Sequence, residues 1–195
     1  NDENLKNIDL SDLLSFDYNY EKNDTKPNTE CIKSNSYKIN IVNGICKDFE
    51  DKNIKIFNLT NNQSNLFFEN KFKSFNDLIV DLNSIFLNSG FILSVKKNKK
   101  ISLKILNITD KNYTIFQKNL INCEFGSNIK ILEEYNFSSN SLNNILYSIN
   151  SEENVRIQHN IIQDFTKSNT LYFTTYADCK KNTSYKQNIF NFSHG

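Results

Sequence analysis

The chain carries a single alanine among its 195 residues, against 23 isoleucines, 16 phenylalanines and 9 tyrosines. β-Branched and aromatic side chains favour strands, and the scarcity of alanine removes the best helix former. Only four glycines and one proline are available for turns, but there are 35 asparagines. Asparagine can replace glycine where the backbone needs a positive φ. The sequence therefore predicts a mainly β protein whose turns are built from asparagine.

The order of polar and apolar residues divides the chain. Residues 1–30 are expected to form a flexible N-terminal arm, in which Leu5, Ile8, Leu13 and Leu14 could support a short acidic helix. Beyond the arm, period-two alternation or short apolar runs predict strands. The expected strands are 37–41, 54–57, 66–68, 91–95, 101–108, 113–116, 120–125, 128–132, 155–161, 171–176 and 185–192, with 141–149 left open as a helical turn or a strand.

One stretch has helical periodicity. Ser74 can cap a helix, and the apolar residues from Phe75 to Phe86 fall on a single helical face. Gly90 supplies a stop signal. We expect one convincing helix, or two short helices at most.

A strand, a lysine-rich turn and a second strand occur twice, at 91–108 and at 171–192. Both are expected to be hairpins. The resulting interpretation is a β-sandwich made of two small tandem β-modules, residues 31–112 and 113–195. The alternative is one sandwich with two ordinary hairpins.

Four cysteines, Cys31, Cys46, Cys123 and Cys179, allow either two disulfides in a secreted protein or four buried thiols in a cytosolic one. Three pairings are possible. If the two modules are real, Cys31–Cys46 and Cys123–Cys179 are preferred, because each bond then stays inside one core.

Eight sequons offer possible glycosylation sites, although a chain so rich in asparagine, serine and threonine contains several by chance. They begin at Asn23, Asn58, Asn62, Asn107, Asn112, Asn136, Asn182 and Asn191.

Motifs for catalysis or metal binding are missing from the sequence. There is no glycine-rich phosphate loop, no nucleophile elbow and no H-E-x-x-H. His159 and His194 lie far from any cysteine in sequence, which disfavours zinc. The acidic neighbours Glu133–Glu134 and Glu152–Glu153 are expected to be solvated charges. We predict no enzymatic activity, no catalytic or metal-binding residue and no cofactor.

Charge and hydropathy exclude two further classes. The chain has 23 basic and 22 acidic residues, a net charge of +1, whereas nucleic-acid binders usually carry a basic excess. No run of 18 apolar residues is present, so no direct membrane span is expected. The lysine-rich turn at 96–100 could meet a glycan or an acidic partner, but is expected to solubilise a hairpin tip.

The sequence Phe173–Lys181, followed by Tyr185–Phe192, resembles the closing strands of the malaria-parasite 6-cysteine (s48/45) surface domains. Cys123-Glu124-Phe125 resembles the step that opens such domains. Each module here would hold two cysteines instead of six, which would make the chain a degenerate, cysteine-poor relative. The resemblance implies a disulfide-bonded Plasmodium β-sandwich that binds proteins and is not an enzyme.

The function expected from these observations is that of a secreted or surface-associated parasite binding protein. It would act in host-cell invasion, fertilisation or immune evasion, as part of a complex. Its partner would be another parasite surface protein or a host protein, and a partner or an anchor outside this chain would hold it at the surface. The alternatives are a carbohydrate-binding or toxin-accessory β-domain, and an intracellular scaffold with reduced cysteines.

Overall fold

A computed structural model describes residues 27–59, 78–110, 113–137, 141–165 and 169–193. The strand expected at 66–68, the Ser74 cap and His194 lie outside these residues. The described elements are β1 (Asn28–Lys33), β2 (Ser36–Val42), β3 (Phe49–Glu50), β4 (Ile54–Asn58), α3 (Leu78–Ile85), β5 (Ser89–Val95), β6 (Lys100–Thr109), β7 (Thr114–Cys123), β8 (Asn128–Phe137), β9 (Leu142–Ser151), β10 (Arg156–Phe165), β11 (Thr170–Cys179) and β12 (Ser184–Ser193).

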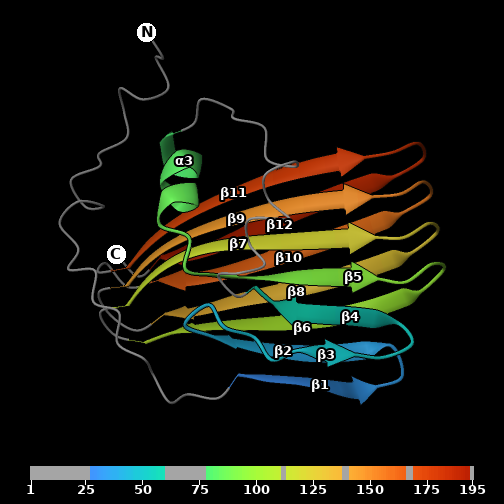
Figure 1. Ribbon diagram of the computed structural model, residues 1–195, viewed down its shortest axis with the longest axis horizontal. Coiled ribbons are helices and arrows are strands. Elements are labelled where there is room, and N and C mark those ends of the chain that lie inside the picture. The colour runs from blue at the N-terminus through green and yellow to red at the C-terminus, as the bar shows by residue number, and fades with distance from the viewer. Residues whose placement is uncertain (1–26, 60–77, 111–112, 138–140, 166–168, 194–195) are drawn as a thin grey trace, which may run out of the picture.

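The strands wind into a parallel β-solenoid of about three turns, and 69% of the structure is β. From β5 onwards the chain alternates between two six-stranded sheets (Figure 1). Sheet A has the order β1-β2-β6-β8-β10-β12, and sheet B has the order β11-β9-β7-β5-β4-β3. We call each sheet B strand and the sheet A strand that follows it a rung. The four rungs are β5–β6, β7–β8, β9–β10 and β11–β12.

The rungs repeat every 28 residues without a shift in register. Thr114 pairs with Leu142 and Leu142 with Thr170 in sheet B. Sheet A repeats the same step from β6 to β12, as Lys100, Asn128, Arg156 and Ser184 show. Residues that are 28 positions apart therefore lie next to one another in adjacent rungs, so that inward positions form columns with inward positions and outward with outward.

The turn inside each rung contains the residues that accept a positive φ. Asn98, Asn154 and Asn182 have φ values of 58°, 61° and 56°, and Gly126 has 70° in the remaining rung. These four positions are also 28 residues apart. The prediction that asparagine builds the turns is confirmed at three of these four positions.

The predicted β-sandwich of tandem s48/45-like modules is wrong. β5 and β6 do not pair with each other, because β5 lies in sheet B and β6 in sheet A. The same is true of β11 and β12. The two strand–turn–strand segments are therefore arches between sheets and not hairpins. The boundary expected at residues 112 and 113 falls between β6 and β7, two strands of one continuous solenoid.

Most strand positions agree with the alternation pattern. The segments 113–116 and 120–125 form one strand, β7, and 141–149 belongs to a strand, β9. The predicted helix is confirmed over Leu78–Ile85 and packs on the outer face of sheet B, with Ile79 against Phe116 and Leu142. Gly90 lies in β5, beyond the helix end. The main core fills the space between the two sheets, which we call the lumen.

Candidate functional site: a buried ionic cluster in the lumen

The lumen contains an acidic residue at its centre. Alternate residues of β8 point inward, so Glu133 lies in a row with Ile129, Ile131 and Tyr135, and its side chain is 0% exposed. Glu134 points outward and pairs with Lys104 at 2.9 Å. The expectation that both residues are solvated is therefore wrong for Glu133.

Four donors from four strands surround the Glu133 carboxylate. Its Oε1 atom accepts hydrogen bonds from Asn107 Nδ2 at 2.7 Å, the Tyr135 hydroxyl at 2.8 Å and the Tyr147 hydroxyl at 2.7 Å. Its Oε2 atom lies 2.8 Å from His159 Nε2. A buried carboxylate is tolerated only when its oxygens are satisfied in this way.

These contacts determine which groups are ionised. Burial alone would raise the pKa of Glu133, but the hydrogen bond and charge of His159 and the hydroxyls of Tyr147 and Tyr135 lower it below its ordinary value. Burial, followed by the charge on Glu133, raises the pKa of Tyr135 and of Tyr147 well above 10. Glu133 is thus an anion held by neutral tyrosine donors.

His159 extends the cluster toward the last rung. Its side chain is 0% exposed, and its Nδ1 atom lies 3.2 Å from the hydroxyl of the half-buried Tyr185. The direction of these two contacts depends on the protons that the imidazole carries: a neutral ring with its proton on Nε2 donates to Glu133 and accepts from the Tyr185 hydroxyl, whereas an imidazolium donates from both nitrogens. The carboxylate, imidazole and phenol form a chain of the kind that can hold or relay a proton.

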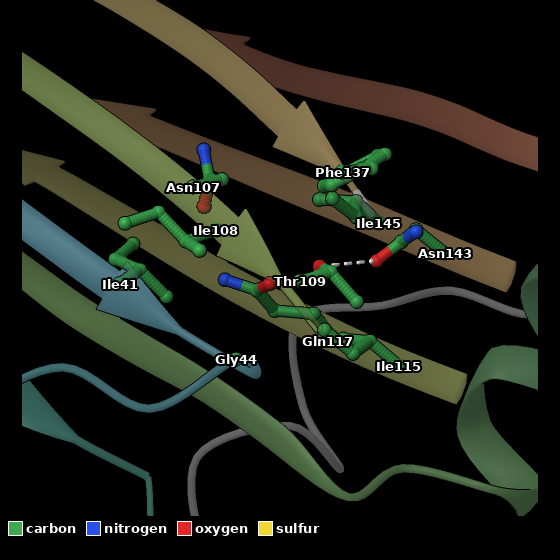
Figure 2. Close-up of a pocket in the computed structure, with 10 residues that line it drawn as sticks. All are labelled: Ile41, Gly44, Asn107, Ile108, Thr109, Ile115, Gln117, Phe137, Asn143 and Ile145. Carbon is green, nitrogen blue, oxygen red and sulfur yellow. Dashed lines mark hydrogen bonds between the residues drawn. The ribbon is translucent and has the colours of Figure 1, made fainter. Parts of the chain in front are cut away.

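A small pocket adjoins the cluster at Asn107. About 160 Å³ of space between atoms is lined by ten residues, including Thr109 and Asn143, whose side chains share a hydrogen bond of 3.1 Å (Figure 2). No water-sized molecule fits this space. The Oδ1 atom of Asn107 has no hydrogen-bond partner among the described residues. The pocket is a packing gap and not a ligand site.

All four cysteines are free thiols, so the predicted disulfides are not formed in the structure. Cys123 and Cys179 both pair with Ser151, one from each side. Two strand spacings, about 9.6 Å, separate their backbones, which exceeds the roughly 7 Å limit for a disulfide. Cys31 lies on β1 opposite Tyr37, and Cys46 follows β2.

The thiols differ in exposure and acidity. Cys46 and Cys123 are buried, and burial raises the pKa of Cys46 to about 12 and also raises the pKa of Cys123. Cys31 and Cys179 are exposed. Within the described part of the chain, no group of three or more histidine, cysteine, aspartate or glutamate side chains could hold a metal ion.

The sequons fall in different environments, and their use stays a prediction. Asn107 is 4% exposed and its amide binds Glu133, so a glycan cannot be attached there in the folded protein. Asn58 is half-buried, whereas Asn136, Asn182 and Asn191 are exposed. Asn23, Asn62 and Asn112 lie outside the described residues.

The sequence interpretation missed the cluster, although a signal was present. Ile129, Ile131 and Tyr135 alternate with polar residues on the predicted strand, and Glu133 occupies an apolar position of that alternation. His159 likewise lies between Ile157 and Ile161. Polar residues at inward positions of regular strands indicate a buried polar network.

A comparison with protein families gives one match. Residues 106–195 match the model described as "SUF system FeS cluster assembly, SufBD core domain". The matched residues include the whole lumen cluster, together with Cys123 and Cys179. No curated protein and no solved structure matches the chain.

This match overturns several expectations. The matched model is not an s48/45 domain, so the resemblance to 6-cysteine proteins is wrong. The predicted secreted or cell-surface location, the Plasmodium assignment and the role in invasion, fertilisation or immune evasion are wrong with it. The alternative of a scaffold with reduced cysteines agrees better with the match and with the four free thiols.

The partner expectation holds only in part. No helix of the described residues is long and apolar enough to cross a membrane. The surface or host protein expected as partner has no support, because the matched description concerns an assembly system.

Proposed function

We propose that the chain takes part in the assembly of iron–sulfur clusters, as a β-solenoid component that acts together with other proteins. The observation that carries this proposal is the family match, which extends over the last part of β6 and over three whole rungs. The role proposed is that of a scaffold and not of an enzyme, with the cluster or its components as cargo.

Cys179 is the thiol proposed to handle this cargo. Thiolate is the form of cysteine that binds iron and reacts with sulfur, so a buried thiol with a raised pKa is a poor choice. This argument removes Cys46 and Cys123. Of the two exposed thiols, Cys31 lies outside the matched residues and Cys179 lies within them.

A reducing compartment follows from the same proposal, because the cargo needs free thiols. Since no described group of side chains provides three ligands for a metal ion, the remaining ligands must come from another protein or from a small thiol. The partner proposed is therefore another protein of the assembly system.

The test is anaerobic incubation of the purified chain with ferrous iron, sulfide and glutathione, followed by visible absorption, Mössbauer spectroscopy and iron analysis. We expect wild-type protein and Cys31→Ser to bind iron and sulfide in equal amounts, and Cys179→Ser to lose most of this binding. Equal binding by both variants would reject Cys179. The absence of bound iron and sulfide from all three proteins would contradict the proposed function itself.

A further inference from the structure

The outer face of sheet A has no cover among the described elements. Apolar side chains that gather on an exposed face mark a surface to which another segment or molecule binds. Sheet B carries α3 on its outer face (Figure 1), held there by Asn83 Nδ2, which donates to the Asn144 carbonyl at 2.6 Å. Sheet A nevertheless presents apolar side chains outward. They are Leu106, Leu132, Ile162, Phe190 and Phe192, of which Phe190 and Phe192 are 49% and 55% exposed.

The same face is basic along the half nearest the turns inside the rungs. One register row contains Lys100, Asn128, Arg156 and Ser184, and the next contains Ser36, Ser102, Lys130, Gln158 and Lys186. The four cations of these rows are exposed, and neither row contains an acidic residue. This half of the face therefore has a charge of +4, although the whole chain has only +1.

The outer face of sheet A thus has cations along one side. Along the other side it has aliphatic and aromatic side chains, interrupted by Glu134, which pairs with Lys104, and by the exposed Asp164. The complement of this face is a segment that carries acidic and apolar residues together. Residues 1–17 contain five acidic residues and one lysine, a net charge of −4. Their apolar residues include Leu5, Ile8, Leu13 and Leu14.

The connection between this segment and the face is short. β1, which begins at Asn28, is the edge strand of sheet A, and Asn28 lies in the same register row as Leu106. From β1 to β12 is five strand spacings, about 24 Å. A helix of 17 residues is about 25 Å long. Residues 18–26 can span up to about 30 Å when extended.

We propose that residues 1–17 bind the outer face of sheet A of the same chain. Their carboxylates face Lys130 and Lys186, and their apolar residues cover Leu106, Ile162 and Phe190. The segment then covers the outer face of sheet A, as α3 covers the outer face of sheet B. This inference goes beyond the proposed function and does not depend on it.

Zero-length carbodiimide cross-linking of the full chain, with the products mapped by mass spectrometry, tests the proposal. We expect cross-links from Lys130 and Lys186 to Asp9 or Asp12, and none from Lys52, which is exposed on the β3–β4 loop. The yield should fall as salt is added, because exposed charges are screened.

Charge exchange provides the matched controls. Asp9→Lys with Asp12→Lys, or Lys130→Glu with Lys186→Glu, should lower the yield of the remaining cross-links between residues 1–17 and the lysines of the two basic rows, which keep both reacting groups, since like charges are then brought together. The variant with all four substitutions should regain this yield. All of the sheet positions changed are exposed, so the fold is retained, and thermal unfolding checks this.

Three results would overturn the proposal. The first is the absence of cross-links between residues 1–17 and sheet A. The second is a yield that does not respond to charge reversal. The third, read from a mixture of isotope-labelled and unlabelled protein, is cross-linking only between two copies, which would assign the face to intermolecular contact.

Discussion

At the scale of single residues, the most consequential side chain is Glu133. Its carboxylate is fully buried and is the common acceptor of Asn107, Tyr135, Tyr147 and His159. Removing such an acceptor leaves several donors unsatisfied in a region that water does not reach, and this is one of the few ways in which one substitution costs several kcal/mol.

We expect Glu133→Leu to lower the free energy of unfolding by about 3–5 kcal/mol, because leucine has a similar volume but leaves the buried hydrogen-bond donors without an acceptor. Glu133→Gln should cost less, since His159 can change tautomer and accept from the new amide. Urea unfolding measures both. The control is Glu134→Leu, one residue away on the outer face, where the ion pair with Lys104 is exposed and worth about 0–1 kcal/mol. A similar loss at both positions would contradict this account of the cluster.

The pH dependence of stability follows from the same residue. The pKa of Glu133 is lower in the folded protein than its ordinary value of 4.5, so the unfolded chain binds more protons in this range. The contribution of Glu133 is therefore complete above pH 4.5 and is lost as the pH falls toward the folded pKa.

The measurement is the urea midpoint of wild-type protein and Glu133→Gln across this acidic range. Asp51 also has a lowered pKa, with backbone and Tyr37 hydrogen bonds outweighing its burial, so the difference between the two proteins is what isolates Glu133. We expect the difference to shrink on acidification. A difference that stayed constant would mean that Glu133 is not ionised in the fold.

At the scale of elements, the turn residue of each rung determines how one strand enters the opposite sheet. Asn154 has a φ of 61°, in the left-handed region that most side chains avoid. Its side chain also accepts a hydrogen bond from Asn182 of the next rung, at 3.2 Å. The turns of neighbouring rungs are therefore linked by side chains as well as by register.

Asn154→Val should reduce the free energy of unfolding by about 1–2 kcal/mol, the cost of a left-handed conformation at a β-branched residue. Asn154→Gly should stay close to wild type, because glycine adopts this φ freely and loses only an exposed hydrogen bond. Denaturant unfolding distinguishes the two. If both variants lost the same amount, the side-chain hydrogen bond and not the backbone conformation would be the important feature.

Elements could be predicted from the sequence, but their pairing could not. Period-two alternation located β2, β6 and β8, and it is a local property of the strand. A hairpin and an arch between sheets have the same local pattern, since both are a strand, a polar turn and a strand. The segment 171–192 resembles 91–108 because the two turns, at Asn98 and Asn182, are three rungs apart. The intermediate turn at Gly126 breaks the asparagine series, which hides the 28-residue period.

The candidate site could not be predicted for a related reason. Glu133 and His159 are 26 residues apart and meet only because β8 and β10 are adjacent in sheet A. A hairpin interpretation pairs each strand with its neighbour in sequence, and such pairing does not bring Glu133 and His159 together. The inward position of Glu133 could be predicted from the alternation, but its hydrogen-bond partners could be identified only once the register of the solenoid was known.

At the scale of the whole molecule, the two ends of the solenoid differ. At the first end, β1 has a register irregularity between Cys31 and Lys33, and β3 is only two residues long. Irregular or short edge strands discourage pairing with other chains. At the other end, β11 and β12 are both regular ten-residue strands, and Asp178 and Lys186 are the only charged residues on them.

This asymmetry predicts that the chain associates through the end formed by β11 and β12. Ile189 on β12 and Ile32 on β1 are matched probes, because both lie on edge strands of sheet A and are 51% and 54% exposed. A lysine on an edge strand opposes edge-to-edge pairing. In sedimentation velocity over a range of protein concentrations, Ile189→Lys should suppress concentration-dependent association, whereas Ile32→Lys should leave it as in wild type. Equal suppression by both substitutions would assign the association to general surface hydrophobicity. The length and regularity of the edge strands would then not determine which end of the solenoid associates with another copy.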